Sequence, residues 1–180
     1  MWVDDDLPQD VESLVIAEGS EWEVKVIDAR RWSRWSQSSG TRAPGPSRAI
    51  HWHHTAGAIT SGSVHEVLLD LVREATSARY GLPYNFLVVP GDDPWAFYLN
   101  DVDGAWPHTL GRNADTAISL QGNYEVLIPR PIEVRLMWTL SHALMTMWGE
   151  EIPILGHRQT SATACPGAHL YKALVDLRDA

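Results

Sequence analysis

The chain has 180 residues, 44% of them apolar and 21% charged, which is enough to bury the core of one domain with an additional arm. Its 14 Lys and Arg residues against 23 Asp and Glu residues give a net charge of −9. This balance argues against binding to nucleic acid or to anionic membranes, and a single cysteine excludes an internal disulfide.

Residues 1–45 are expected to form an N-terminal arm packed on the domain. The start of the chain, MWVDDDLPQD, is acidic, which is the opposite of the basic start of a secretory signal peptide. Two apolar stretches, at 11–18 and 22–27, predict short strands or turns. The segment that follows, to about residue 47, is rich in Ser, Gly and Pro and predicts a loop; its Trp32 and Trp35 need to be covered by the domain.

From residue 48 onwards, predicted strands alternate with predicted helices. Short segments predict strands at 49–55, which lies between Pro46 and Gly57, at 84–89, which ends at Pro90-Gly91, and at 95–99 and 116–120. The middle two are expected to form a hairpin. Helical periodicity and start signals predict helices from a cap at Ser61 or Ser63 to about Arg79, from 131 to 149, and from 166 to 178. Residues 152–155 are expected to form a short connection. The alternation predicts an α/β domain with helices packed on a sheet.

Three histidines lie in the predicted strand at 49–55. Side chains alternate along a strand, so His51 and His53 share one face while Trp52 and His54 share the other. The end of a rigid strand is a good place for an imidazole that binds a metal. Ordinary core or surface histidines would give the same pattern.

The segment GHRQTSATACPG, residues 156–167, contains His157 and, eight residues later, the single cysteine, Cys165. Such a pair can close a zinc site across a loop, with a third ligand from a distant strand. Three protein ligands leave the fourth coordination position open for water, which is the arrangement of catalytic zinc sites. A free cysteine is also often a small buried apolar residue, an alternative that weakens when His157 and the histidine-rich strand are considered together.

Four sequence blocks resemble the zinc-dependent N-acetylmuramoyl-L-alanine amidases of type 2, the family that includes phage endolysins and peptidoglycan recognition proteins. The blocks occur in the family's order within residues 48–176 and are IHWHHTAG, LPYNFLVVPGDDPWAF, HTLGRNADTAISLQGNY and GHRQTSATACPG. The resemblance implies a central mixed β-sheet flanked by helices, in an amidase domain at residues 46–180. It also implies hydrolysis of the amide that joins N-acetylmuramic acid to L-alanine of the stem peptide.

Matched residue by residue, the resemblance implies that zinc is bound by His53, His157 and Cys165, with His54 as the alternative strand ligand. Tyr84 matches a tyrosine near the metal, and Thr163 matches a position that holds Lys in some relatives and Thr in others. Both hydroxyls are expected to stabilise an oxyanion by hydrogen bonding.

The same comparison assigns residues to the substrate groove. His108 and Asn113 match groove residues. Separately, the net charge of −9 would repel anionic wall polymers, so Arg112 or Arg158 is expected to offer local positive charge to stem-peptide carboxylates. Ser119 stands where one branch of the family has a glutamate as general base, so the base is not identified. Trp52, Trp95 and Trp106 are either groove walls or, as is more common for Trp, core residues.

The expected partner is bacterial peptidoglycan, bound by a monomer without contact to nucleic acid or membrane. With no signal peptide visible, a phage endolysin that acts on the wall after release from the host cytoplasm fits best. Two alternatives stay open. A non-catalytic peptidoglycan-binding module would typically lack the cysteine ligand, and a zinc peptidase acting within the stem peptide would use other ligand spacings such as HExxH, which does not occur here.

Overall fold

The computed structural model describes residues 12–30, 40–41, 46–77 and 81–180. Its main sheet contains β1 (Glu12–Ile16), β2 (Val24–Asp28), β4 (Ile50–His54), β5 (Phe86–Val89), β6 (Trp95–Tyr98), β8 (Thr116–Leu120) and β9 (Ile154–Gly156). The helices are α1 (Val64–Ser77), α2 (Pro131–Trp148), α3 (Ala168–Arg178) and the short 3-10 helix η2 (His157–Gln159). Strands β3 (Gly40–Thr41) and β7 (Gly104–Ala105) form a separate small sheet.

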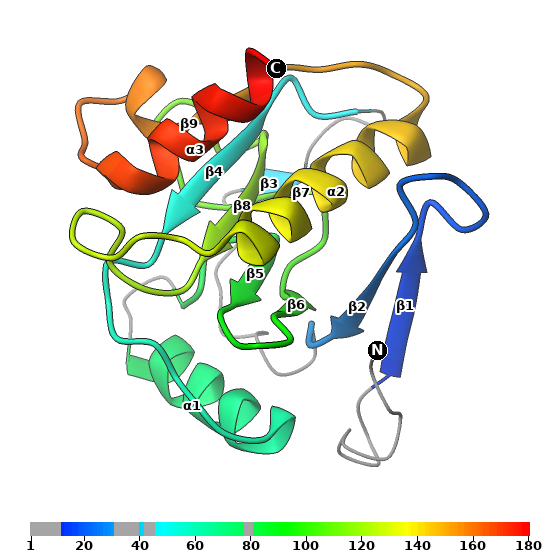
Figure 1. Ribbon diagram of the computed structural model, residues 1–180. Coiled ribbons are helices and arrows are strands. Elements are labelled where there is room, and N and C mark those ends of the chain that lie inside the picture. Colours follow the sequence, from blue (N-terminus) through cyan, green and yellow to red (C-terminus); the bar gives the residue numbers. More distant parts are fainter. Residues whose placement is uncertain (1–11, 31–39, 42–45, 78–80) are drawn as a thin grey trace.

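The main sheet has seven strands in the order β1-β2-β6-β5-β8-β4-β9 and is mixed. Strand β4 runs parallel to both of its neighbours, with His53 opposite Ser119 of β8 and Trp52 opposite Gly156 of β9. Strands β5 and β6 form the predicted antiparallel hairpin. Figure 1 shows the helices packed around this sheet, which confirms the predicted α/β fold with a central mixed sheet.

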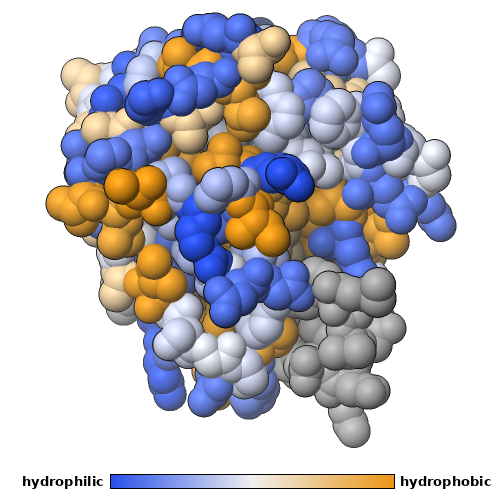
Figure 2. Space-filling model, viewed as in Figure 1, coloured by the Kyte–Doolittle hydropathy of each residue, from blue (hydrophilic) through white to orange (hydrophobic). Residues whose placement is uncertain are grey.

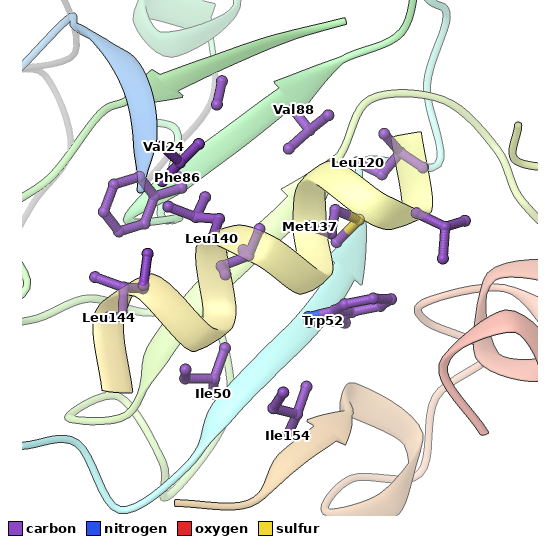
Figure 3. Close-up of a cluster of buried hydrophobic side chains, with 14 of the residues drawn as sticks. Val24, Ile50, Trp52, Phe86, Val88, Leu120, Met137, Leu140, Leu144 and Ile154 are labelled. Carbon is purple, nitrogen blue, oxygen red and sulfur yellow. The ribbon is translucent and has the colours of Figure 1, made fainter. Parts of the chain in front are cut away.

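Helix α2 covers one face of the sheet with an apolar core. Ile50 and Trp52 of β4 point toward Met137 and Leu140 of the helix (Figure 3). The indole Nε1–H of Trp52 donates a hydrogen bond to Ser141 Oγ at 3.1 Å. Trp52 is therefore a core residue. The helix begins at Pro131, as predicted, and ends at a glycine in the left-handed conformation.

Helix α1 covers part of the opposite face. Its Val64, Leu68 and Leu71 belong to a second apolar cluster that includes Leu87 of β5 and Phe97 of β6. Ser63, one of the two predicted caps, accepts a hydrogen bond from the backbone N–H of Glu66 and donates its own backbone N–H to the Glu66 carboxylate. Because side chains alternate along β4, this is also the face that carries His51 and His53.

Two parts of the fold differ from the sequence expectations or extend them. Residues 154–156 form an edge strand instead of a connection, because Ile50 N–H donates to Pro153 O at 3.0 Å and Ile154 pairs with Ile50. Residues 12–28 of the predicted arm form β1 and β2 at the other edge of the main sheet (Figure 1, right). The predicted loop containing Trp32 and Trp35 lies outside the described residues.

Hydrophilic and hydrophobic residues are mixed on the surface seen in Figure 2. The large apolar side chains that are most exposed in the described ranges are Leu110, Val126 and Ile128, all in loops. Among the helices described, none combines the length and the apolar character needed to cross a membrane.

Candidate metal centre

His53, His157 and Cys165 bring three ligand atoms within 4.8 Å of one another. His53 lies near the end of β4, and His157 follows directly after β9, whose parallel pairing with β4 sets the two strand ends side by side. Their ring centroids are 4.5 Å apart, and Cys165 Sγ lies 3.5 Å from His53 Nδ1. The structure thus gathers the three residues to which the sequence resemblance assigns zinc binding.

His54, the alternative ligand, points to the other side of the strand. Its Nδ1 accepts a hydrogen bond from the backbone N–H of Tyr124 at 3.0 Å. Its backbone N–H, by contrast, donates to Cys165 Sγ at 3.4 Å. The side chain of His54 therefore anchors a neighbouring loop, while its main chain supports the sulfur.

The loop between His157 and Cys165 is held by Arg158 and Thr163. The backbone N–H of Arg158 donates to Cys165 O at 2.8 Å, and Thr163 Oγ1 accepts from Cys165 N–H at 3.2 Å. The Arg158 guanidinium donates to the Ala164 carbonyl, pairs with Glu125 at 2.9 Å and lies over the Tyr171 ring. Arg158, which the sequence suggested for substrate carboxylates, is thus already engaged in contacts that shape this loop.

The electrostatics of the two histidines fit a metal that prefers nitrogen and sulfur ligands, whereas the thiol must lose its proton to bind one. Burial, reinforced by His108 and His157, lowers the pKa of His53 well below its usual value. Burial and His51 also lower the pKa of His157, so both rings are neutral near pH 7 and offer a lone pair. Burial raises the pKa of the Cys165 thiol to about 11. Two neutral imidazoles and one sulfur are a typical donor set for catalytic zinc, with a fourth position left open.

Tyr84 lies beside this group, just before β5. Its ring centroid is 5.3 Å from that of His53. Burial, and to a lesser degree Cys165, raises the pKa of the Tyr84 hydroxyl, while the neighbouring hydroxyl of Ser119 acts in the opposite direction. Ser119 itself is fully buried. Tyr84 therefore stays protonated at neutral pH and can serve as a hydrogen-bond donor.

Of the two residues expected in the substrate groove, His108 is buried and Asn113 is half-buried. His108 is only 7% exposed, and its Nδ1 lies 3.3 Å from His53 Nε2. With the amide nitrogen of Asn113 turned toward the loop carbonyls, it donates to Thr109 O at 2.7 Å. Asn113 thus stabilises the loop that carries His108.

Sequence reasoning missed a buried pair next to the centre. His51 is fully buried, and its Nε2 donates to the Asp115 carboxylate at 3.1 Å. Asp115 lies directly before β8 and is itself buried. The available signal was Asp115, an acidic residue directly before the apolar strand β8, together with His51 in the strand β4.

Comparison with known proteins yields matches among solved structures alone. No protein-family model matches the chain, and no curated protein sequence matches it. Peptidoglycan recognition protein LB of Drosophila matches with a TM-score of 0.69 and 18% identity, over 82% of this chain and 90% of that chain. Human peptidoglycan recognition protein IβC, solved with a glycosamyl muramyl pentapeptide, matches with a TM-score of 0.68 and 19% identity, over 83% and 93% of the two chains.

An enzyme is also among the similar structures. The endolysin LysCS, an N-acetylmuramoyl-L-alanine amidase from Clostridium intestinale, matches with a TM-score of 0.59 and 18% identity, over 79% of this chain and 91% of that chain. At these identities the similarity establishes the fold. The chain has the fold shared by peptidoglycan recognition proteins and this endolysin amidase, as its sequence motifs predict.

Proposed function

We propose that the protein is a zinc-dependent N-acetylmuramoyl-L-alanine amidase, which hydrolyses the amide between N-acetylmuramic acid and L-alanine in peptidoglycan. The main support is the convergence of His53, His157 and Cys165, two imidazoles and a thiol that match a catalytic zinc site. The similar folds of an amidase and of a recognition protein solved with a muramyl pentapeptide support the substrate class.

A zinc ion held by these three residues would supply a Lewis acid and lower the pKa of a bound water to about 7. The protein's own contribution is hydrogen bonding. Tyr84, protonated because burial raises its pKa, donates to the oxyanion that develops on the amide carbonyl. Thr163 Oγ1 already accepts a hydrogen bond from Cys165 N–H, so its own proton is available as a second donor.

Two other functions make different predictions for the same experiment. Zinc-loaded protein is incubated with purified peptidoglycan, and the products are analysed for new chain ends. Free amino groups on L-alanine identify an amidase, new ends within the stem peptide identify a peptidase, and intact peptidoglycan with bound protein identifies a binding module. The presence of Cys165 favours hydrolysis over binding alone.

The control for this assay is His157→Ala. This variant is expected to lose zinc and hydrolysis while the domain stays folded, because His157 is half-buried at the start of η2 and outside the apolar core. Full zinc occupancy in His157→Ala would show that the ligands are wrongly assigned.

We further propose the biological setting of a phage endolysin, acting as a monomer on the wall of a bacterial host. The amidase motifs and the similar fold of an endolysin amidase support this setting. Clearing of a suspension of permeabilised host cells by added protein tests it.

A further inference from the structure

We propose that His108 is a positioning residue of the metal centre, which holds His53 in the tautomer whose Nδ1 faces Cys165. This proposal rests on the proposed function, because it concerns the orientation of a proposed zinc ligand. It gives His108 a role other than the substrate contact that the sequence resemblance implies.

The first step establishes which ring nitrogen of His108 carries the proton. Its Nε2 lies 2.8 Å from the backbone carbonyl oxygen of Asp115. A carbonyl oxygen only accepts hydrogen bonds, so Nε2 of His108 carries the proton. A neutral imidazole has one N–H, and the Nδ1 of His108 is therefore an acceptor.

The second step shows that the acceptor on His108 fixes the protonated nitrogen of His53. The Nε2 of His53 lies 3.3 Å from the acceptor Nδ1 of His108 and donates to it. With its proton on Nε2, His53 keeps a lone pair on Nδ1, the nitrogen that lies 3.5 Å from Cys165 Sγ. Thr109 Oγ1, 2.9 Å from His108 Nδ1, is a competing donor for the same lone pair.

The third step is what anchors His108. Asp115 is 3% exposed, and its backbone N–H donates to Arg112 O at 2.9 Å. Its carboxylate holds His51 Nε2 at 3.1 Å, while its carbonyl holds His108. A buried polar group without a hydrogen-bond partner lowers the stability of the fold. Here Asp115, directly before β8, provides the partner for both His51 and His108.

The second histidine extends the support to the other imidazole ligand. His51 Nδ1 lies 3.5 Å from Thr160 Oγ1, which is 3.2 Å from the backbone oxygen of His157. These contacts hold the main chain of His157 and not its ring. Partners that hydrogen-bond the ring of a metal ligand, as His108 does for His53, orient that ligand, and their loss typically weakens metal affinity about 10–100-fold.

The test compares His108→Phe with His108→Asn in the full chain. Phe retains a ring of similar size and removes the ring's hydrogen bonds to Asp115, His53 and Thr109, whereas the Asn side-chain oxygen can replace Nδ1 as an acceptor for His53. Zinc affinity, measured by competition with a chelator, is expected to fall about 10–100-fold in His108→Phe and to recover in part in His108→Asn. The matched control, Thr109→Val, removes the competing donor and is expected to bind zinc as the wild type does. Unchanged zinc affinity in His108→Phe would overturn the proposal.

A second measurement does not depend on any variant. Nitrogen-15 NMR of the zinc-free wild-type protein reports which nitrogen of each ring carries the proton. The proposal requires a proton on Nε2 and a lone pair on Nδ1 in both His53 and His108, and a proton on His53 Nδ1 would refute it. If the wild type binds no zinc, the proposed function fails, but this tautomer is still measured and still decides the hydrogen-bond assignment.

Discussion

The two faces of strand β4 are both buried but differ in chemistry. Ile50 and Trp52 on one face, and His51 and His53 on the other, are all at most 1% exposed. The first pair packs against apolar side chains under α2, whereas the second pair is held by hydrogen bonds to Asp115 and His108. Four consecutive residues thus serve the core and the proposed metal centre at once, because strand side chains alternate.

Removal of a histidine from each side of the strand tests this difference between the two faces most directly. His53→Ala is expected to lose zinc and hydrolytic activity, because it deletes a ligand atom from the group. His54→Ala is expected to keep most of its zinc. It leaves the Tyr124 N–H without an acceptor, which should lower the free energy of unfolding by about 1–3 kcal/mol. Metal analysis and denaturant unfolding of both variants check this, and the opposite pattern would place the ligand on the α2 face.

Tyr84→Phe tests the chemistry of the histidine face, the face of β4 that carries His51 and His53, because it retains the ring beside His53 and deletes only the hydroxyl. Loss of one oxyanion donor typically lowers kcat about 10²–10³-fold, and we expect a loss of that size with unchanged zinc content. The rate must be measured on zinc-loaded protein. A near-normal kcat would mean that the Tyr84 ring is structural and that Thr163 or another group stabilises the oxyanion.

The pH dependence of zinc binding follows from the pKa shifts on the histidine face. The pKa of the Cys165 thiol is raised to about 11 and those of His53 and His157 are lowered, so near neutral pH only the thiol has a proton to lose. Zinc affinity should therefore increase as the pH rises, about tenfold per unit between roughly pH 6 and 8, with one proton released per zinc. Chelator competition across this range tests the slope, and an affinity independent of pH would count against a thiolate ligand. In Cys165→Ser the remaining affinity should lose this slope.

The smallest effect is expected at Ser119, the partner of His53 across β4 and β8. Ser119→Ala should lower kcat less than about tenfold, because a neutral hydroxyl is a poor general base near pH 7. Comparison with Tyr84→Phe under identical conditions ranks the two neighbouring hydroxyls. A larger loss in Ser119→Ala than in Tyr84→Phe would reverse the proposed order.

Local patterns made much of the fold predictable. The β4 segment lies between a proline and a glycine, and α2 has a helical period and an N-terminal proline. These are properties of the segments themselves, and both elements were predicted. Strand β9 was not, because three residues carry no periodicity and become a strand only through pairing with Ile50 and its neighbours. The two-residue strands β3 and β7 were missed for the same reason.

The site was predictable where a motif carries it and unpredictable where it depends on register. The resemblance pointed to His53, His157 and Cys165, which the fold gathers. The contact between His51 and Asp115 spans 64 residues and depends on how β4 and β8 align. The inward orientation of His108 likewise depends on the path of the loop before β8, which no local sequence pattern specifies.

The proposed ligands also lie far apart along the chain, with 112 residues separating His53 from Cys165. A metal ion shared by them would act as a cross-link in a chain whose single cysteine allows no internal disulfide. In the loop-entropy model, closing a loop of about 100 residues removes about 4.7 kcal/mol of conformational entropy from the unfolded state. Bound metal would then tie η2 and the start of α3 to strand β4, next to the edge strand β9, and chelation would release these last elements first, as a local opening visible by hydrogen exchange.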